Sequence, residues 1–135
     1  MMHLQRRGDD HHDTALYAGA GRVGIEWYFR GVTDLSTSVM LYRLELGAEE
    51  GQHLHLAGHP DSCSAISEDE LYLVIAGEVV VTVGDETAVL GPGDAVYVPE
   101  GVRHGVRNDS DAPAELVLLF GPATGNPFRE TPAAS

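Results

Sequence analysis

Short runs of branched and aromatic residues recur along the middle of the chain, and turn residues separate them. Strands are predicted at residues 23–29, 39–46, 71–75, 79–83, 87–90, 95–98, 102–106 and 115–120. They follow one another at intervals of roughly 8–12 residues, the spacing typical of a β-sandwich or barrel. No window keeps an apolar period of about 3.6 residues over several turns, so no long helix is predicted. The pattern therefore predicts a single all-β domain.

The two ends of the chain lack this pattern. Residues 1–22 are polar and mixed and are expected to form an N-terminal arm. Residues 121–135, rich in Gly, Pro, Ala and Thr, are expected to form a C-terminal tail, which leaves residues 23–120 for the β domain. Within that domain, the polar and serine-rich segment 57–69 is too long for a hairpin turn. Loops near that length are often functional lids.

The composition describes a small, acidic, folded domain. Of the 135 residues, 43% are hydrophobic and 21% charged, and acidic residues outnumber basic ones by 21 to 8, for a net charge of -13. So few Lys and Arg residues argue against a nucleic-acid partner, and the negative charge argues against an anionic membrane surface. No segment has the roughly 18 unbroken apolar residues of a membrane span, and the first residues lack the apolar stretch of a signal peptide. One cysteine, Cys63, cannot form an internal disulfide, so we expect a cytoplasmic protein.

The histidines supply the candidate chemistry. His53 and His55 are one residue apart in a segment that can be extended, and side chains two apart on a strand point to the same face. Glu70 opens the next strand and can add a carboxylate, and His104 lies far away in sequence. A His-x-His pair alone is more often two solvated side chains than a metal site, so the residues around it decide between these two interpretations. Imidazoles and a carboxylate with open positions suit divalent Fe, Mn, Co, Ni, Cu or Zn.

Glycine and proline residues around these four complete two motifs. The first, Gly-x5-His-x-His and then Glu-x6-Gly, begins at Gly47 and ends at Gly77. The second, Gly-x5-Pro-x-Gly-x2-His-x3-Asn, runs from Gly93 to Asn108 with every fixed position matched. In both motifs, and in the strand context around them, the sequence resembles the cupin superfamily. The resemblance extends over about residues 39–120.

The resemblance to cupins implies a double-stranded β-helix, or jelly roll, with a metal ion inside the barrel. Carried over by position, the metal ligands would be His53, His55, Glu70 and His104. Small cupins commonly form homodimers by strand exchange at the barrel edge. The apolar stretch 24–29 is expected at that contact, because edge strands need covering. The run Trp27-Tyr28-Phe29 is accordingly interpreted as core or dimer contact rather than as a cage around a substrate.

The sequence departs from the family at one place. Fourteen residues separate His55 from Glu70, where cupins usually have three or four. Since Glu70 keeps its spacing to the following glycine, we infer an insertion between two strands and keep Glu70 as the ligand. Asp61 or Glu68 in its place, and His59 as an added ligand, stay open as alternatives.

Two further residues are candidates for catalysis. Tyr72 lies two residues after Glu70, so strand alternation places it on the same face, where its hydroxyl could bind substrate or act as an acid. His59 lies in the inserted segment and could act as a general acid or base, because histidine exchanges a proton near neutral pH. The ordinary interpretations are core filling for Tyr72 and a solvated loop position for His59. Cys63, in the same segment, is interpreted as a loop or packed cysteine.

Several reactions are compatible with the resemblance, since cupins include dioxygenases, decarboxylases, isomerases, cyclases and sensors. We expect a metal-dependent enzyme acting on a small organic molecule, with an Fe(II)-dependent oxygenase as the first hypothesis. The alternatives are an isomerase, cyclase or lyase that uses the metal as a Lewis acid, and a non-catalytic small-molecule-binding cupin. Fe(II) is the favoured cofactor, with Zn, Ni, Mn, Co and Cu as the other candidates.

Overall fold

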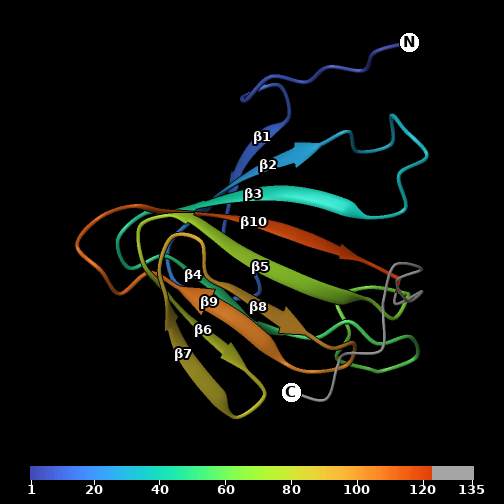
Figure 1. Cartoon of the computed structure of the whole chain (residues 1–135). Helices are drawn as coiled ribbons and strands as arrows, with labels where there is room; N and C mark the ends of the chain where they lie inside the picture. The colour runs from blue at the N-terminus through green and yellow to red at the C-terminus, as the bar shows by residue number, and fades with distance from the viewer. Residues whose placement is uncertain (123–135) are drawn as a thin grey trace, which may run out of the picture.

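The computed structural model describes residues 1–122, which form ten strands and no helix (Figure 1). The strands are β1 (His11–Thr14), β2 (Val23–Tyr28), β3 (Ser38–Leu44), β4 (Glu49–His53), β5 (Asp69–Ala76), β6 (Val79–Val83), β7 (Glu86–Leu90), β8 (Ala95–Val98), β9 (His104–Arg107) and β10 (Ala114–Gly121). Each of the eight predicted segments overlaps one of these strands, and the all-β prediction is confirmed. Within the described residues, no helix is long and apolar enough to cross a membrane.

Two antiparallel sheets face each other and enclose the core. The larger has the strand order β1-β2-β3-β10-β5-β8, and the smaller has the order β4-β9-β6-β7. Side chains alternate inward and outward along β10 and β5, so Leu116, Leu118 and Val74 are fully or almost fully buried. Their partners in the core are mainly Val23, Leu44, Val79, Val81, Val98 and Val106. This two-sheet arrangement is the expected jelly roll.

The last described strand lies in the middle of the larger sheet rather than at an edge. β10 pairs with β3 on one side, where Leu118 is opposite Met40, and with β5 on the other, where Leu118 is opposite Tyr72 (Figure 1). Residue 121 therefore belongs to the sheet, although the sequence pattern assigned it to the tail. The rest of the expected tail, residues 123–135, lies outside the described residues.

The N-terminal segment 1–22, expected as an arm, is attached to the barrel. β1 pairs with β2 and forms the edge of the larger sheet. The Glu26 carboxylate accepts hydrogen bonds from the backbone amides of Gly8 (2.5 Å) and Asp10 (2.8 Å). Because β1 covers one edge of β2 and β3 covers the other, the stretch 24–29 is not the free edge that the expected dimer contact required.

A second part of this segment crosses β4 at close range. The amide of Gly51 donates to the carbonyl of Leu16 (2.9 Å), and an added Cβ at Gly51 would lie 1.8 Å from the carbonyl oxygen of Tyr17. No side chain larger than hydrogen fits there. Tyr17 itself has a φ of 50°, in the left-handed region that most residues avoid. The crossing therefore holds Tyr17 at a fixed place beside β4.

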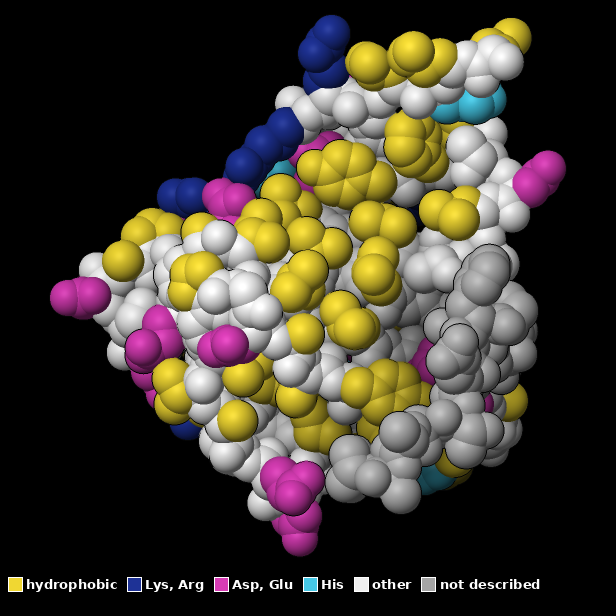
Figure 2. Space-filling model, viewed as in Figure 1, with side chains coloured by type: hydrophobic (Ala, Val, Ile, Leu, Met, Phe, Trp, Pro, Cys, Tyr) yellow, Lys and Arg dark blue, Asp and Glu magenta, His cyan; other side chains and the backbone are white. Residues whose placement is uncertain are grey.

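Apolar side chains gather on the outer face of the larger sheet (Figure 2). Strand alternation directs Val117 and Leu119 of β10 outward, next to Leu71 and Leu73 of β5. Tyr97 of β8 continues the face and is 58% exposed. We call this the outer apolar face; among the described residues, those at its centre (Val117, Leu119, Leu71 and Leu73) carry no charge.

Candidate metal centre

Four side chains converge inside one end of the barrel, and they are the four carried over from the motifs. The ligand atoms of His53, His55, Glu70 and His104 all lie within 4.8 Å of one another, and all four residues are buried. His53 ends β4 and is the direct strand partner of His104, which begins β9. Glu70 comes from β5 in the opposite sheet. The cluster thus joins the two sheets at the ends of their strands.

The hydrogen bonds of the three imidazoles direct one nitrogen of each ring into the cluster. His53 and His104 face backbone carbonyls with Nδ1, at 2.8 Å from Gly51 and 2.8 Å from Val102 respectively. Because a carbonyl only accepts, Nδ1 carries a proton in both rings, and Nε2 is the nitrogen that faces the cluster. His104 Nε2 lies 2.7 Å from a Glu70 oxygen, and His55 Nε2 lies 3.5 Å from the same oxygen. Metal-binding histidines are typically held in this way by acceptors on their other nitrogen.

The cluster's electrostatics also suit a cation. Burial tends to raise the pKa of Glu70, but hydrogen bonds from His104 and His55 outweigh it and hold this pKa at about 2. Burial and the neighbouring His104 lower the pKa of His53 to about 4, so its imidazole is neutral at neutral pH. Burial opposes protonation of His104, yet the hydrogen bond to Glu70 raises the pKa of His104 overall. One carboxylate and three imidazoles fit a divalent transition metal, which would replace the proton between His104 and Glu70.

A second buried carboxylate lies next to the cluster, and the sequence did not predict it. Glu50 is 1% exposed, and its Oε1 is 4.0 Å from His53 Nε2. The hydroxyls of Tyr42 and Tyr72 both donate hydrogen bonds to it. Burial and the charge of Glu70 raise the pKa of Glu50 to about 8. Glu70 has imidazole partners, which can carry a positive charge. Glu50 has two tyrosine hydroxyls, which donate hydrogen bonds but carry no positive charge.

Tyr72, a candidate for catalysis, faces the interior as strand alternation predicted. It has no exposed surface, and its hydroxyl is engaged by Glu50. Burial, with Glu50 and Glu70 adding to it, raises the pKa of Tyr72 well above its ordinary value of 10. Tyr72 does not line the cavity that opens beside the cluster.

A cavity of about 240 Å³ opens beside the cluster. It is lined by Leu16, Tyr17, Ile25, Trp27, Met40, Tyr42, His53, His55, Cys63, Ser64, Glu68, Glu70 and Phe120. The Tyr17 ring stacks on His53, with centroids 3.8 Å apart and an angle of 18° between the planes. Trp27 was interpreted as core or dimer contact. The structure shows that it packs against the core and also lines this cavity.

The remaining candidates from the inserted segment lie outside the cluster. His59 is half-buried, and its Nδ1 accepts a hydrogen bond from the Asp61 amide (3.0 Å). The Asp61 carboxylate pairs with Arg103 (2.7 Å) at the surface. Glu68 lies 3.3 Å from Nδ1 of His55, on the side of the ring away from the cluster. Of the three carboxylates left open by the sequence, Glu70 is the one in the cluster.

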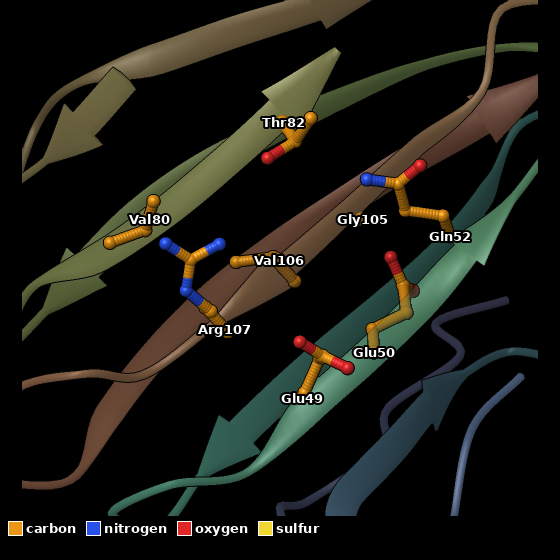
Figure 3. Close-up of a pocket in the computed structure, with 8 residues that line it drawn as sticks. All are labelled: Glu49, Glu50, Gln52, Val80, Thr82, Gly105, Val106 and Arg107. Carbon is orange, nitrogen blue, oxygen red and sulfur yellow. The ribbon is translucent and has the colours of Figure 1, made fainter. Parts of the chain in front are cut away.

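A second hollow, of about 180 Å³, lies on the outer face of the smaller sheet (Figure 3). It is bordered by polar side chains of β4, β6 and β9, among them Gln52, Thr82 and Arg107. Here the β4–β9 pairing is irregular between Glu50 and His53. This hollow contains none of the four cluster residues.

Comparisons with known proteins agree with the motifs. A family model for the cupin domain matches residues 65–120. The chain is 33% identical over 95 residues to an uncharacterized protein of Streptomyces coelicolor, covering 70% of this chain and 80% of that one. It is 34% identical over 92 residues to the tetracenomycin polyketide synthase protein TcmJ of Streptomyces glaucescens, where the match covers 68% of this chain and spans 56% of TcmJ.

Solved structures show the same fold. A predicted oxalate decarboxylase of Thermotoga maritima superposes with a TM-score of 0.73 at 18% identity, covering 89% of this chain and 98% of that one. At this identity the likeness concerns the fold alone. With the sequence matches and both motifs, it leads to one conclusion: the chain belongs to the cupin superfamily.

Proposed function

We propose that this cupin is a metal-dependent enzyme that acts on a small organic molecule bound in the cavity beside the cluster. The convergence of three imidazole nitrogens on Glu70 carries this proposal, because it forms a buried donor set of three nitrogens and one oxygen. The cavity adjoins that donor set directly, since His53, His55 and Glu70 belong to its walls. An ion held by these four residues would keep open positions toward the cavity.

The reaction we propose first is oxygenation, with Fe(II) as the ion. Fe(II) would supply the one-electron chemistry that activation of O2 requires. The chain's own residues would do the rest: Glu70 holds the charge, and Tyr17 shields one face of His53 from water. The mostly apolar cavity suits both O2 and an organic substrate.

A second candidate is a Lewis-acid reaction, such as a cyclisation or isomerisation. The likeness to TcmJ, a polyketide synthase protein, favours it. The same four residues would then hold Zn, Ni or another ion that polarises a carbonyl group of the substrate. The metal found in the protein separates the two candidates.

Metal analysis of protein purified without a histidine tag tests the proposal. We expect about one transition-metal ion per chain in the wild type and little in His104→Ala. His12→Ala, which removes an exposed histidine of β1, is the matched control and should retain the metal. Oxygen uptake by the Fe(II)-loaded protein in the presence of organic compounds then tests oxygenation. A wild type without stoichiometric metal, or a His104→Ala variant with full metal content, would contradict the proposal.

The homodimer is also a proposal, and the outer apolar face is the surface we assign to it. The chain has a net charge of -13, so two copies repel each other except where an uncharged surface is buried. Leu119, 36% exposed, lies on this face. Sedimentation velocity at micromolar concentration should show a dimer for the wild type and a monomer for Leu119→Lys. A monomeric wild type would contradict the assignment.

A further inference from the structure

The cavity beside the cluster has walls that specify a kind of ligand. We propose that it binds neutral aromatic molecules of one or two rings that carry a hydroxyl or carbonyl group. This inference rests on the proposed function in one respect only, namely that such a molecule is the substrate.

The size of the cavity sets the upper limit on the ligand. An engineered cavity of about 150 Å³ binds benzene. At about 240 Å³, this cavity therefore has room for one substituted ring or two small fused rings. A larger ring system would extend into solvent.

Aromatic side chains of the walls favour a flat ligand. Tyr17, stacked on His53, lies on the side of the N-terminal segment. Trp27 and Phe120 lie on the side of the larger sheet, with ring centroids 6.0 Å apart. Offset-stacked and edge-to-face contacts between rings add to the gain from burying apolar area. A planar ring between these residues gains such contacts, whereas a saturated ring of equal volume does not.

The charges of the walls favour a neutral ligand. Within residues 1–122, no Lys or Arg lines the cavity, so in the metal-free protein an organic anion would find no cationic Lys or Arg side chain there. The two acidic wall residues are both engaged: Glu68 lies 3.3 Å from His55, and Glu70 lies 2.7 Å from His104. Neither is therefore free to pair with a cationic ligand. Burying an unpaired charge costs far more than the cavity's apolar contacts return.

The distribution of polar atoms favours an oxygen-bearing ligand. Most of the polar wall comes from one stretch of chain, residues 53–70, which contributes His53, His55, Ser64, Glu68 and Glu70. The opposite wall comes from β2, β3 and β10, which contribute Trp27, Met40 and Phe120 among other apolar residues. A ligand whose ring packs against the apolar wall directs its hydroxyl or carbonyl substituent toward the polar wall.

Three probes of similar shape test the proposal: p-cresol, 4-methylbenzoate and 4-methylcyclohexanol. Trp27 is the only tryptophan of the chain and lines this cavity, so its fluorescence responds to a ligand bound there. Because Trp27 also borders a smaller hollow, with Arg30 over its ring, variants of the cavity wall are needed to locate the binding. Excited at the red edge of its absorption, Trp27 should respond saturably to p-cresol in metal-free protein. We expect the other two probes to bind about tenfold more weakly or worse. Equal or tighter binding of 4-methylbenzoate would overturn the neutral class, and equal binding of 4-methylcyclohexanol would overturn the aromatic class.

Variants locate the binding. Tyr17→Ala removes a side chain that is 41% exposed and should weaken p-cresol binding about fivefold or more without loss of folding. Tyr97→Ala removes a tyrosine of the outer apolar face and should leave the affinity unchanged. Equal effects of both variants, or no saturable binding by the wild type, would overturn the proposal.

The same measurements keep this inference separate from the proposed function. His104→Ala should lose the metal and still bind p-cresol, since His104 does not line the cavity. If p-cresol binds but the wild type contains no metal, the ligand class holds and the enzyme proposal fails. If the metal is present but p-cresol does not bind, the metal site of the proposed function holds and the ligand class fails.

Discussion

Two glutamates lie near each other in the same barrel interior, yet their surroundings give them opposite chemistry. Glu70 is among three imidazoles, and its pKa is held at about 2. Glu50 is under two tyrosine hydroxyls, and burial with the nearby Glu70 raises its pKa to about 8. Burial acts upward on both pKa values, so the difference comes from the partners. Imidazoles can share a positive charge with Glu70, whereas tyrosines offer Glu50 hydrogen bonds alone.

Glu70→Gln should have the largest effect, because it removes the negative charge of the four-residue cluster. We expect transition-metal affinity to fall about hundredfold or more, or about 2.7 kcal/mol. Glu50→Gln is the matched variant and should change the affinity much less. Calorimetric titration of both metal-free variants with Fe(II) or Co(II) measures the difference. A larger loss of metal affinity in Glu50→Gln than in Glu70→Gln would show that Glu50, and not Glu70, is the main anionic ligand.

Glu50→Gln should instead change the response of stability to pH. Because the folded pKa of Glu50 lies above its ordinary value of 4.5, the folded protein binds more protons than the unfolded chain between the two values. This residue's contribution to the free energy of unfolding is thus complete below about pH 4.5 and is lost as the pH rises through about 8. At pH 9, the metal-free variant should be more stable than the wild type by about 2 kcal/mol.

Urea unfolding of the metal-free proteins at pH 5 and pH 9 measures this effect. The pH dependence that Glu70 contributes has the opposite sign. Because its folded pKa is lowered, its contribution to the free energy of unfolding is present above about pH 4.5, its ordinary pKa, and is lost as the pH falls toward about 2. A Glu50→Gln variant that is less stable than the wild type at pH 9 would mean that the charged carboxylate is favourable there.

The two tyrosine hydroxyls that donate to Glu50 should each contribute to stability. Tyr72→Phe leaves one oxygen of the buried Glu50 without its donor, which should cost about 1–2 kcal/mol in the free energy of unfolding. Tyr97→Phe is the control, because it removes a hydrogen bond to Asp69 at the surface (3.0 Å) and should cost much less. Equal costs in urea unfolding would show that the hydroxyl contact with Glu50 adds nothing.

Glu115 is a third glutamate, paired with two arginines near the surface, and we expect its substitution to have the smallest effect. Hydrogen bonds from Arg7 and Arg43 lower the pKa of this carboxyl group, with burial opposing them. Its stabilising contribution should be present above its ordinary value of 4.5 and lost as the pH falls below it. Since both arginines are largely exposed, Glu115→Gln should cost less than about 1 kcal/mol at neutral pH. A loss of stability in Glu115→Gln that persists at acidic pH would indicate that the Glu115 side chain stabilises the fold by packing rather than by its charge.

The cluster could be predicted from the sequence, and Glu50 could not. Motif spacing identified His53 and Glu70 despite the inserted segment, because each keeps its distance to a turn glycine. Glu50 is three residues before His53, so strict alternation directs it outward. The irregular pairing of β4 with β9 between these two residues shifts the alternation and brings both side chains inside. A local irregularity of this kind depends on the partner strand and leaves no pattern in the sequence.

The residues that line the cavity could not be predicted from local sequence patterns either. Trp27 belongs to a predicted strand, so the run around it indicated core or interface. Its place in the cavity depends on how β2 sits relative to the cluster, which is a tertiary property. Tyr17 comes from a segment expected to be a loose arm. The signal available for it was Gly51, whose missing side chain permits the crossing, but many glycines of the chain serve turns instead.

The central position of β10 dictates how the protein is completed during synthesis. Until residues 114–121 have left the ribosome, β3 and β5 face each other with unpaired edges. Open strand edges are templates for pairing with other chains. Phe120, one wall of the cavity, arrives with this same strand. A nascent chain that stops short of β10 thus exposes two unpaired strand edges to its neighbours, and β10 closes these edges and supplies the Phe120 wall of the cavity in one step.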